Sequence, residues 1–192
     1  MSYTTYITEA LVCGSYNQGG ADRSFRLFTR EHGMLSATAR SVREERSRQR
    51  YALQDFSRIR VALVKGKADW RIGSVEVIAN DFSSAKTKAA RGSVVKLYRL
   101  LRRYIQGEDA HLDLFDFCVE ALACTPNLDK EAGFFDVYLE SRILSLLGYV
   151  EQGRLPADLI GTSIHRAVKN SDPYLLADLQ SIVAEAHANS QL

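Results

Sequence analysis

The spacing of apolar residues changes partway along this chain of 192 residues. Up to about residue 80, apolar and polar side chains alternate in short runs that are separated by glycine or polar residues. Beyond residue 81, the apolar side chains recur every three or four residues. Alternation is typical of half-buried strands, and the longer period is typical of amphipathic helices. We therefore expect an α+β protein with a strand domain at residues 1–80 and an all-α domain at residues 81–192.

The first domain contains five short runs that we expect to be strands. In the clearest of them, Ile59, Val61 and Leu63 fall on one face and arginines fall on the other. A tight turn is expected at residues 31–33, where Gly33 can adopt a positive φ. The five runs are residues 3–13, 24–29, 34–39, 56–64 and 70–78. Five strands with tight turns in so short a stretch favour a small barrel.

The second domain contains three helical patterns with both ends marked and three further helix starts. We expect the three helices at residues 83–106, 110–124 and 130–147, the last ended by Gly148. Their predicted N-caps are Ser83 or Ser84, Asp109 and Asp129. Further helices are expected to start at Pro156, at Thr162–Ser163 and at Asp172–Pro173.

The formal net charge of +2 conceals an uneven distribution of charge. Residues 1–80 hold 13 basic and 8 acidic side chains, and residues 81–103 hold 7 and 1. Residues 104–192 hold 5 basic and 14 acidic side chains. A basic first half predicts a polyanionic partner, and the acidic second half could face a basic protein.

Enzymatic and metal chemistry find no support in the sequence. The cysteines Cys13, Cys118 and Cys124 lack the close pairing of zinc ligands, so we expect no metal, and we expect the last two to be buried thiols on a helix. No nucleophile elbow or phosphate-binding glycine loop occurs, so we expect neither catalysis nor a cofactor. The few cysteines, the absence of a secretory start and the absence of a long apolar window predict a cytoplasmic protein that does not cross a membrane.

The most informative cluster is a run of arginines at residues 40–50, which we call the arginine segment. We expect this run to lie in a loop beside the barrel. Guanidinium groups bind phosphate oxygens through paired hydrogen bonds, so such a loop predicts contact with a nucleic-acid backbone. Glu44 and Glu45 interrupt the run, which leaves a solvated, partly self-neutralised loop as an alternative. Tyr6, Tyr16, Phe28, Tyr51 and Trp70 lie among the basic residues and could stack on bases, although we expect Trp70 to pack in the core. The predicted nucleic-acid-binding residues are Arg23, Arg26, Arg40, Arg43, Arg46, Arg48, Arg50, Arg58, Arg60, Lys65 and Lys67.

A second basic row lies on the first long helix predicted in the second domain. Its apolar stripe would be buried, which leaves the basic side chains on the opposite face. Arg99, Arg102 and Arg103 are therefore candidates for contact with DNA or with a protein partner, and a solvated helix face is the alternative.

Two stretches of sequence resemble the bacterial recombination mediator family RecO. Residues 21–35 read ADRSFRLFTREHGML, and residues 138–149 read YLESRILSLLGY, ending in the family's "LLGY". Ser41 stands where the family usually has glycine, and Asp55 where it usually has proline. The four-cysteine zinc element that many members carry after "LLGY" has no counterpart here, and the chain is shorter than usual and lacks the family's basic C-terminal segment.

The resemblance implies an N-terminal OB-fold and a helical C-terminal domain in a non-enzymatic protein associated with the nucleoid. Such a protein binds single- and double-stranded DNA and anneals complementary strands. It acts with RecR to load RecA onto DNA coated by single-strand DNA-binding protein, whose C-terminal tail is a further expected partner. Two alternatives stay open from the residues alone: an OB-fold protein that binds RNA, and a structural adaptor that acts through its helices.

Overall fold

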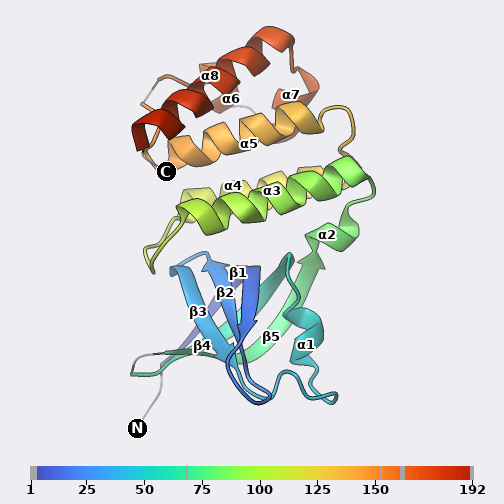
Figure 1. The fold of residues 1–192 in the computed structure, drawn as a ribbon, viewed down its shortest axis with the longest axis vertical. Coiled ribbons are helices and arrows are strands. Elements are labelled where there is room, and N and C mark those ends of the chain that lie inside the picture. The colour runs from blue at the N-terminus through green and yellow to red at the C-terminus, as the bar shows by residue number, and fades with distance from the viewer. Residues whose placement is uncertain (1–3, 68, 152, 161–162, 191–192) are drawn as a thin grey trace. The chain divides into compact units, whose positions relative to one another are not determined.

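A computed structural model describes residues 4–67, 69–151, 153–160 and 163–190 (Figure 1). The chain divides into two compact units. The first comprises Met1–Ser84 with Leu101–Phe115, and the second comprises Ala85–Leu100 with Asp116–Leu192. The assignment of residues 1–80 and residues 81–192 as two domains with separate roles stays a prediction.

The first unit contains five strands: β1 (Thr5–Asn17), β2 (Arg23–Thr29), β3 (Gly33–Ala39), β4 (Ser57–Lys65) and β5 (Trp70–Asn80). They close into a barrel in the order β1-β2-β3-β5-β4, as Figure 1 shows. Strand β1 closes the ring because its first half pairs with β4 and its second half with β2. All pairs are antiparallel except β3 with β5. The predicted α+β class, with an OB-like closed sheet followed by helices, is confirmed.

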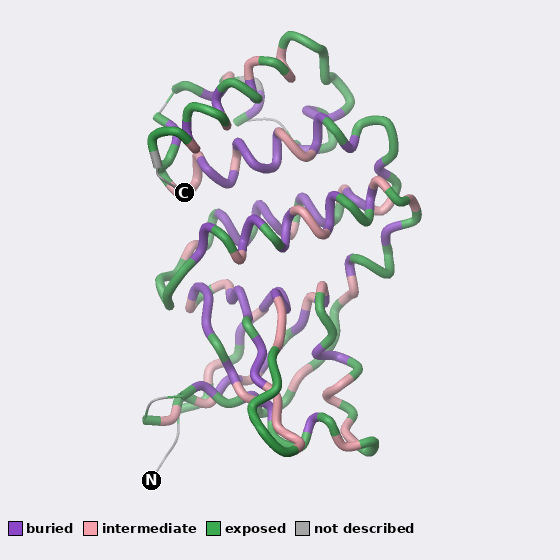
Figure 2. The backbone as a smooth tube through the Cα atoms, viewed as in Figure 1, coloured by how far each residue is buried: buried purple, intermediate pink, exposed green. Residues whose placement is uncertain are grey.

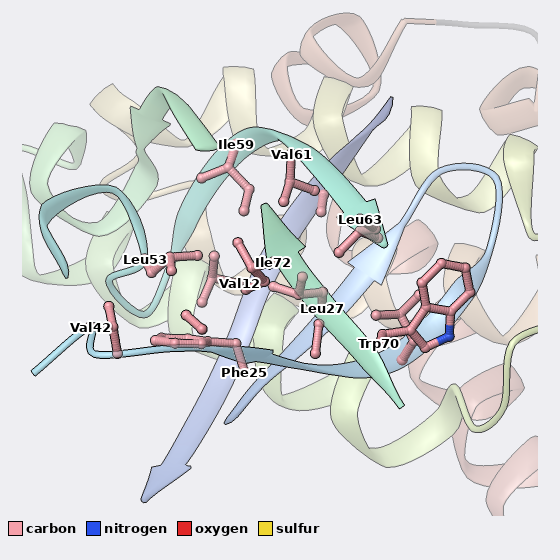
Figure 3. Close-up of a cluster of buried hydrophobic side chains, with 14 residues drawn as sticks. Val12, Phe25, Leu27, Val42, Leu53, Ile59, Val61, Leu63, Trp70 and Ile72 are labelled. Atoms are coloured by element: carbon pink, nitrogen blue, oxygen red, sulfur yellow. The ribbon is translucent and has the colours of Figure 1, made fainter. Parts of the chain in front are cut away.

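The barrel core follows from the alternation in the strands. Ile59, Val61 and Leu63 point into the barrel, as predicted, and they meet Phe25 and Leu27 from β2 (Figure 3). Trp70 also belongs to this core, which confirms that it packs. The connection after β3 adds two further buried side chains, Val42 and Leu53. Each fully buried side chain of this size contributes about 1.5–3 kcal/mol to folding.

A bulge interrupts the ladder between β1 and β2 at Cys13. The carbonyl oxygen of Cys13 accepts a hydrogen bond from Arg102 Nη1 at 2.8 Å, so a side chain satisfies a backbone group in the irregular part of the ladder. Burial raises the pKa of the Cys13 thiol to about 12, which makes this thiol inert.

The turn between β2 and β3 requires glycine. Gly33 has a φ of 59°, as predicted, and the backbone of residues 107–109 lies against it. A Cβ atom at Gly33 would lie 2.2 Å from the carbonyl oxygen of Asp109. The amide of Met34 donates to the carbonyl of Gly107 at 2.9 Å, so the 101–115 segment is hydrogen-bonded to the barrel within the first unit.

The helices are α1 (Gln49–Ala52), α2 (Asp81–Ser84), α3 (Lys88–Tyr104), α4 (Leu112–Cys124), the 3-10 helix η1 (Thr125–Asn127), α5 (Ala132–Leu146), α6 (Ala157–Ile160), α7 (Ile164–Lys169) and α8 (Pro173–Ser190). Buried and exposed residues alternate along the longer ones, as Figure 2 shows.

Three predicted helix starts are wrong. Helix α3 starts at Lys88, because Thr87 Oγ1 accepts the amide of Ala90 at 2.9 Å, whereas Ser83 and Ser84 lie in the separate short helix α2. Helix α4 starts at Leu112 rather than Ala110. Helix α5 starts at Ala132 rather than Lys130, since Asp129 accepts the amide of Ala132 through its backbone carbonyl and not through a cap.

The other helix boundaries agree better with the sequence. Asp172 Oδ1 accepts the amides of Tyr174 and Leu175 at 2.8 and 2.9 Å, which confirms the start at Pro173. Gly148, with a φ of 82°, follows the end of α5 as predicted. Cys118 is buried as expected, but Cys124 is only partly buried because it ends α4 beside a surface cavity.

Candidate nucleic-acid interface

The arginine segment is held against the loop between β1 and β2 (Figure 1). The amide of Ser41 donates to Asp22 Oδ1 at 2.8 Å, and the amide of Arg43 donates to the carbonyl of Ala21 at 3.1 Å. Arg43 Nη1 also donates to the carbonyl of Gly20 at 2.8 Å. These bonds place the segment and the β1–β2 loop at one end of the barrel, so the arginines are displayed on a fixed backbone.

Ser41 adopts a backbone conformation that L residues rarely use. Its φ is 49°, in the left-handed region. Glycine enters this region without steric cost, which gives a physical reason for the glycine that RecO proteins usually have here. The turn that starts the arginine segment therefore depends on this one residue.

The five arginines of the segment differ in their surroundings. Arg40 and Arg48 are exposed, and within the described part of the chain neither has a carboxylate partner. Arg46 is 87% exposed and pairs with Glu44 at 2.8 Å, which lowers the pKa of that carboxyl. Arg50 lies in helix α1 and not in a loop, which corrects the prediction for this residue.

The side chain of Arg50 packs against an exposed aromatic ring. Its guanidinium carbon lies 4.8 Å from the centre of the Tyr51 ring, and its Nη2 donates to the Tyr51 hydroxyl at 2.7 Å. Tyr51 is 62% exposed. Tyr16 is also exposed, whereas Phe28 and Trp70 are buried, so only part of the predicted aromatic set is available for stacking.

A pocket of about 250 Å³ opens between the arginine segment and β2. Its basic lining comes from β2 and from the arginine segment, and its apolar lining from three core residues that lie together in Figure 3. The lining residues are Arg23, Phe25, Val42, Arg43, Arg50 and Leu53. The structure thus joins Arg23 to the arginine segment, a juxtaposition that residue spacing alone gave no means of finding.

Three other predicted basic residues are ion-paired instead. Arg58 Nε lies 3.0 Å from Asp81, and Arg60 Nη2 lies 3.5 Å from Glu9. Lys65 Nζ lies 3.1 Å from Glu108. Of the rest, Arg26 and Lys67 are exposed.

Glu108 holds the β4–β5 turn through a second contact. The indole N–H of Trp70 donates to Glu108 Oε1 at 2.9 Å, and Lys65 Nζ lies 4.7 Å from the centre of the Trp70 ring. The hydrogen bond from Trp70 is the main cause that lowers the pKa of Glu108. Sequence reasoning missed this acid because a separation of 43 residues leaves no local signal.

The basic row on α3 does not form one uniform surface. Arg99 is exposed in the second unit, whereas Arg102 donates to the carbonyl of Cys13 within the first unit. Arg103 lies 5.3 Å from the centre of the Tyr104 ring. Lys96, in the second unit, pairs with Glu140 at 3.0 Å. Contact of this row with DNA or a partner stays a prediction.

The second unit holds a larger cavity of about 560 Å³ between η1 and α7. Its lining includes Cys124, Glu131, His165 and Lys169. Burial raises the pKa of Cys124, so this side chain is not an activated thiol. Among the described residues, no three His, Cys, Asp or Glu side chains gather as metal ligands.

Within the described ranges, no helix combines the length and the apolar character that a membrane span needs.

Comparison with known proteins identifies the family. Residues 1–80 match the family described as "Recombination protein O N terminal". The DNA repair protein RecO of Heliobacterium modesticaldum is 44% identical over 156 residues, which are 80% of this chain and 55% of the relative. RecO of Myxococcus xanthus is 30% identical over 130 residues, 67% of this chain and 52% of the relative. RecO of Caldanaerobacter subterraneus is 25% identical over 143 residues, 74% and 58% respectively.

The chain spans about half the length of these curated relatives. The match to the N-terminal family covers the whole barrel, and the relatives extend the similarity into the helices. The chain therefore belongs to the RecO family of DNA repair and recombination proteins.

Proposed function

We propose that this chain is a non-enzymatic DNA-binding protein that grips strands by their phosphates at the arginine-rich end of its barrel. The observation that carries the proposal is the local imbalance of charge. Arg40, Arg43, Arg48 and Arg50 have no carboxylate partner within the described residues, and only Arg46 is paired. Guanidinium groups that no acid neutralises are available to phosphate oxygens.

Binding to the phosphate backbone of DNA is suited to strand annealing. Two complementary strands can approach only if their phosphate charges are neutralised, and they can pair only if their bases stay free. Contacts to phosphates position a strand without reading its sequence. The exposed rings of Tyr16 and Tyr51 can hold single-stranded bases by stacking, which is also independent of sequence.

The role in recombination extends the proposal to partners. We extend the proposal to a mediator that acts with RecR and with single-strand DNA-binding protein to load RecA, as the resemblance to the RecO family implies. The names of the relatives, "DNA repair protein RecO", support a role in DNA repair. We place the tail of single-strand DNA-binding protein at the exposed Arg99 of α3, which offers a positive charge to an acidic peptide. This assignment includes cytoplasmic action at the nucleoid.

The test replaces Arg40, Arg43 and Arg48, three arginines without a carboxylate partner among the described residues, with alanine and measures binding to several unrelated oligonucleotides by fluorescence anisotropy over a salt series. Each phosphate contact on a single strand adds roughly 0.7 to the slope of log affinity against log salt, so the slope should fall by about 2. Affinity should fall by a similar factor for every sequence.

A matched control removes the same charge from the second unit. Lys130, Arg166 and Lys169 are exposed, and their replacement by alanine should leave the slope unchanged. An equal loss in both triple variants would mean that net charge, and not the arginine segment, governs binding. Oligonucleotides of RNA and DNA of equal length separate the remaining alternatives: a strong preference for RNA would contradict the repair role, and no binding to either would favour an adaptor.

A further inference from the structure

The pocket between β2 and the arginine segment has a charge that is unusual for so small a site. Three of its six lining residues are arginines, and none is acidic. Arg23 lies on β2, whereas Arg43 and Arg50 belong to the arginine segment, so the fold brings β2 and this segment together. In the described part of the chain, no carboxylate pairs with any of the three.

Arg23 is the least satisfied of the three. Its Nε is buried and has no hydrogen-bond partner among the described residues. Its guanidinium carbon lies 5.9 Å from the centre of the Phe25 ring, so the ring flanks the side chain. Buried donors nearly always find acceptors, and an arginine that lines a pocket with an unpaired Nε–H is suited to donate a hydrogen bond to a ligand oxygen.

The size of the pocket limits what it can hold. At about 250 Å³ it is smaller than the roughly 300–1,000 Å³ of pockets for drug-sized ligands. Phe25, Val42 and Leu53 are buried core residues and form its apolar side, and the pocket is open to solvent on the other side. Such a recess takes one compact anionic group and not a run of nucleotides.

A terminal phosphate fits this recess better than an internal one. A phosphate monoester carries close to two negative charges at neutral pH and presents three terminal oxygens, which match three guanidinium groups. It is joined to the strand by a single bond, so all three of its terminal oxygens can face the arginines. An internal phosphodiester carries one charge, is joined to the strand on two sides and offers only two free oxygens, so it matches the three guanidinium groups less well.

We propose that the pocket of Arg23, Arg43 and Arg50 binds the terminal phosphate of a DNA strand, so that the barrel prefers phosphorylated strand ends. This inference rests on the proposed function, because it assumes that the arginine-rich end of the barrel contacts DNA. It adds the class of ligand, a phosphate monoester, and it predicts where on a strand the protein settles.

The test uses short single strands of one sequence that carry a 5′-phosphate, a 3′-phosphate or hydroxyls at both ends. Each strand competes with a labelled oligonucleotide for the full chain in an anisotropy assay at fixed salt. Hydrogen bonds to a charged group are among the stronger ones, so a phosphorylated strand should bind roughly fivefold more tightly than the hydroxyl strand. Comparing the 5′ and 3′ strands shows which end the pocket accepts.

Variants then locate the preference. Arg50→Gln and Arg23→Gln should both bring the ratio of affinities close to one, and Arg50→Gln is the safer variant because α1 is a short surface helix. Arg48→Gln is the matched control: it removes the same charge from the same segment but does not line the pocket. It should weaken binding of all three strands equally and keep the ratio.

The outcomes separate this inference from the proposed function. Equal affinity of the wild type for all three strands overturns the terminal-phosphate site and leaves backbone binding intact. A ratio that survives both Arg23→Gln and Arg50→Gln places the preference elsewhere and also overturns the site. No binding of any strand overturns the proposed function as well.

Discussion

Two groups of basic side chains on the first unit, the arginine segment and the bases along β4, have different surroundings. In the arginine segment, one of five arginines has a carboxylate partner among the described residues. Along β4, Arg58, Arg60 and Lys65 each face an acid from β1, α2 or the 101–115 segment. The two regions are equally basic in sequence, but only the first leaves its charges available. We infer that β4 uses its charges to hold the barrel together, and that the arginine segment uses them for binding.

The largest expected effect comes from breaking the most buried pair of the β4 region. Asp81 is 3% exposed and Arg58 is 21% exposed. Asp81→Asn leaves the Arg58 charge without its partner, which should cost about 3 kcal/mol because a buried pair that loses one member keeps an uncompensated charge. The slope of DNA affinity against salt should not change.

Unfolding in urea, followed by fluorescence, measures this loss. The chain has one tryptophan, Trp70, which lies in the barrel core, so its emission reports on the first unit. Glu9→Gln is the control, since the pair of Glu9 with Arg60 is exposed and worth less than about 1 kcal/mol. Equal losses in the two variants would show that burial does not distinguish these pairs.

The second prediction concerns Arg102, a candidate DNA contact that the structure places under the barrel bulge. Arg102→Met removes the donor to the Cys13 carbonyl and should destabilise the first unit by about 2 kcal/mol, because a buried acceptor is left unsatisfied. Arg99→Met is exposed and should change stability little. If Arg102→Met unfolds at the same urea concentration as the wild type but binds DNA more weakly, then Arg102 contacts DNA and does not serve to stabilise the barrel.

The sequence predicted the strands and helices far better than it predicted the contacts between residues that are distant in sequence. Alternation located the five strands and the residues of the barrel core, because burial on one face of a strand leaves a local pattern. The start of α3 failed because Ser83, Ser84 and Thr87 all suit an N-cap, and only the fold decides which one meets a free amide. The pairing of Arg102 with Cys13 spans 89 residues, so it depends on tertiary structure that no local spacing encodes.

The candidate site shows the same limit. The density of basic residues in the sequence identified the arginine segment, but it marked Arg58, Arg60 and Lys65 as equally good candidates for contact with nucleic acid. What separates the two sets is the position of Glu9, Asp81 and Glu108, acids that are distant in sequence from the bases they meet. The convergence of Arg23 with Arg50 is equally nonlocal.

A smaller effect is expected at the turn that begins the arginine segment. Ser41→Gly relieves a left-handed conformation and should stabilise the first unit by up to about 1 kcal/mol, since glycine adopts this φ without a steric penalty. Because Ser41 donates to Asp22 through its backbone, the hydrogen bond survives the substitution. Ser36→Gly, at an exposed position inside β3, should instead destabilise by roughly 0.5–1 kcal/mol. A loss of stability in Ser41→Gly would mean that the serine side chain compensates for its strain.

The smallest expected effect is the sharpest test of the comparison between the two regions. Arg60 and Arg48 are both exposed arginines of the first unit, but Arg60 lies 3.5 Å from Glu9, and Arg48 has no acidic partner within the described residues. Removing Arg60 also frees the charge of Glu9, yet it should leave the salt slope of DNA binding unchanged and stability within about 0.5 kcal/mol. Arg48→Gln should lower the slope by roughly 0.7, the value of one phosphate contact on a single strand. The two single variants carry the same net charge, so anisotropy over one salt series compares them directly. If Arg60→Gln lowers the slope as much as Arg48→Gln does, then ion pairing does not withhold a basic side chain from DNA, and the binding surface must extend from the arginine segment across β4.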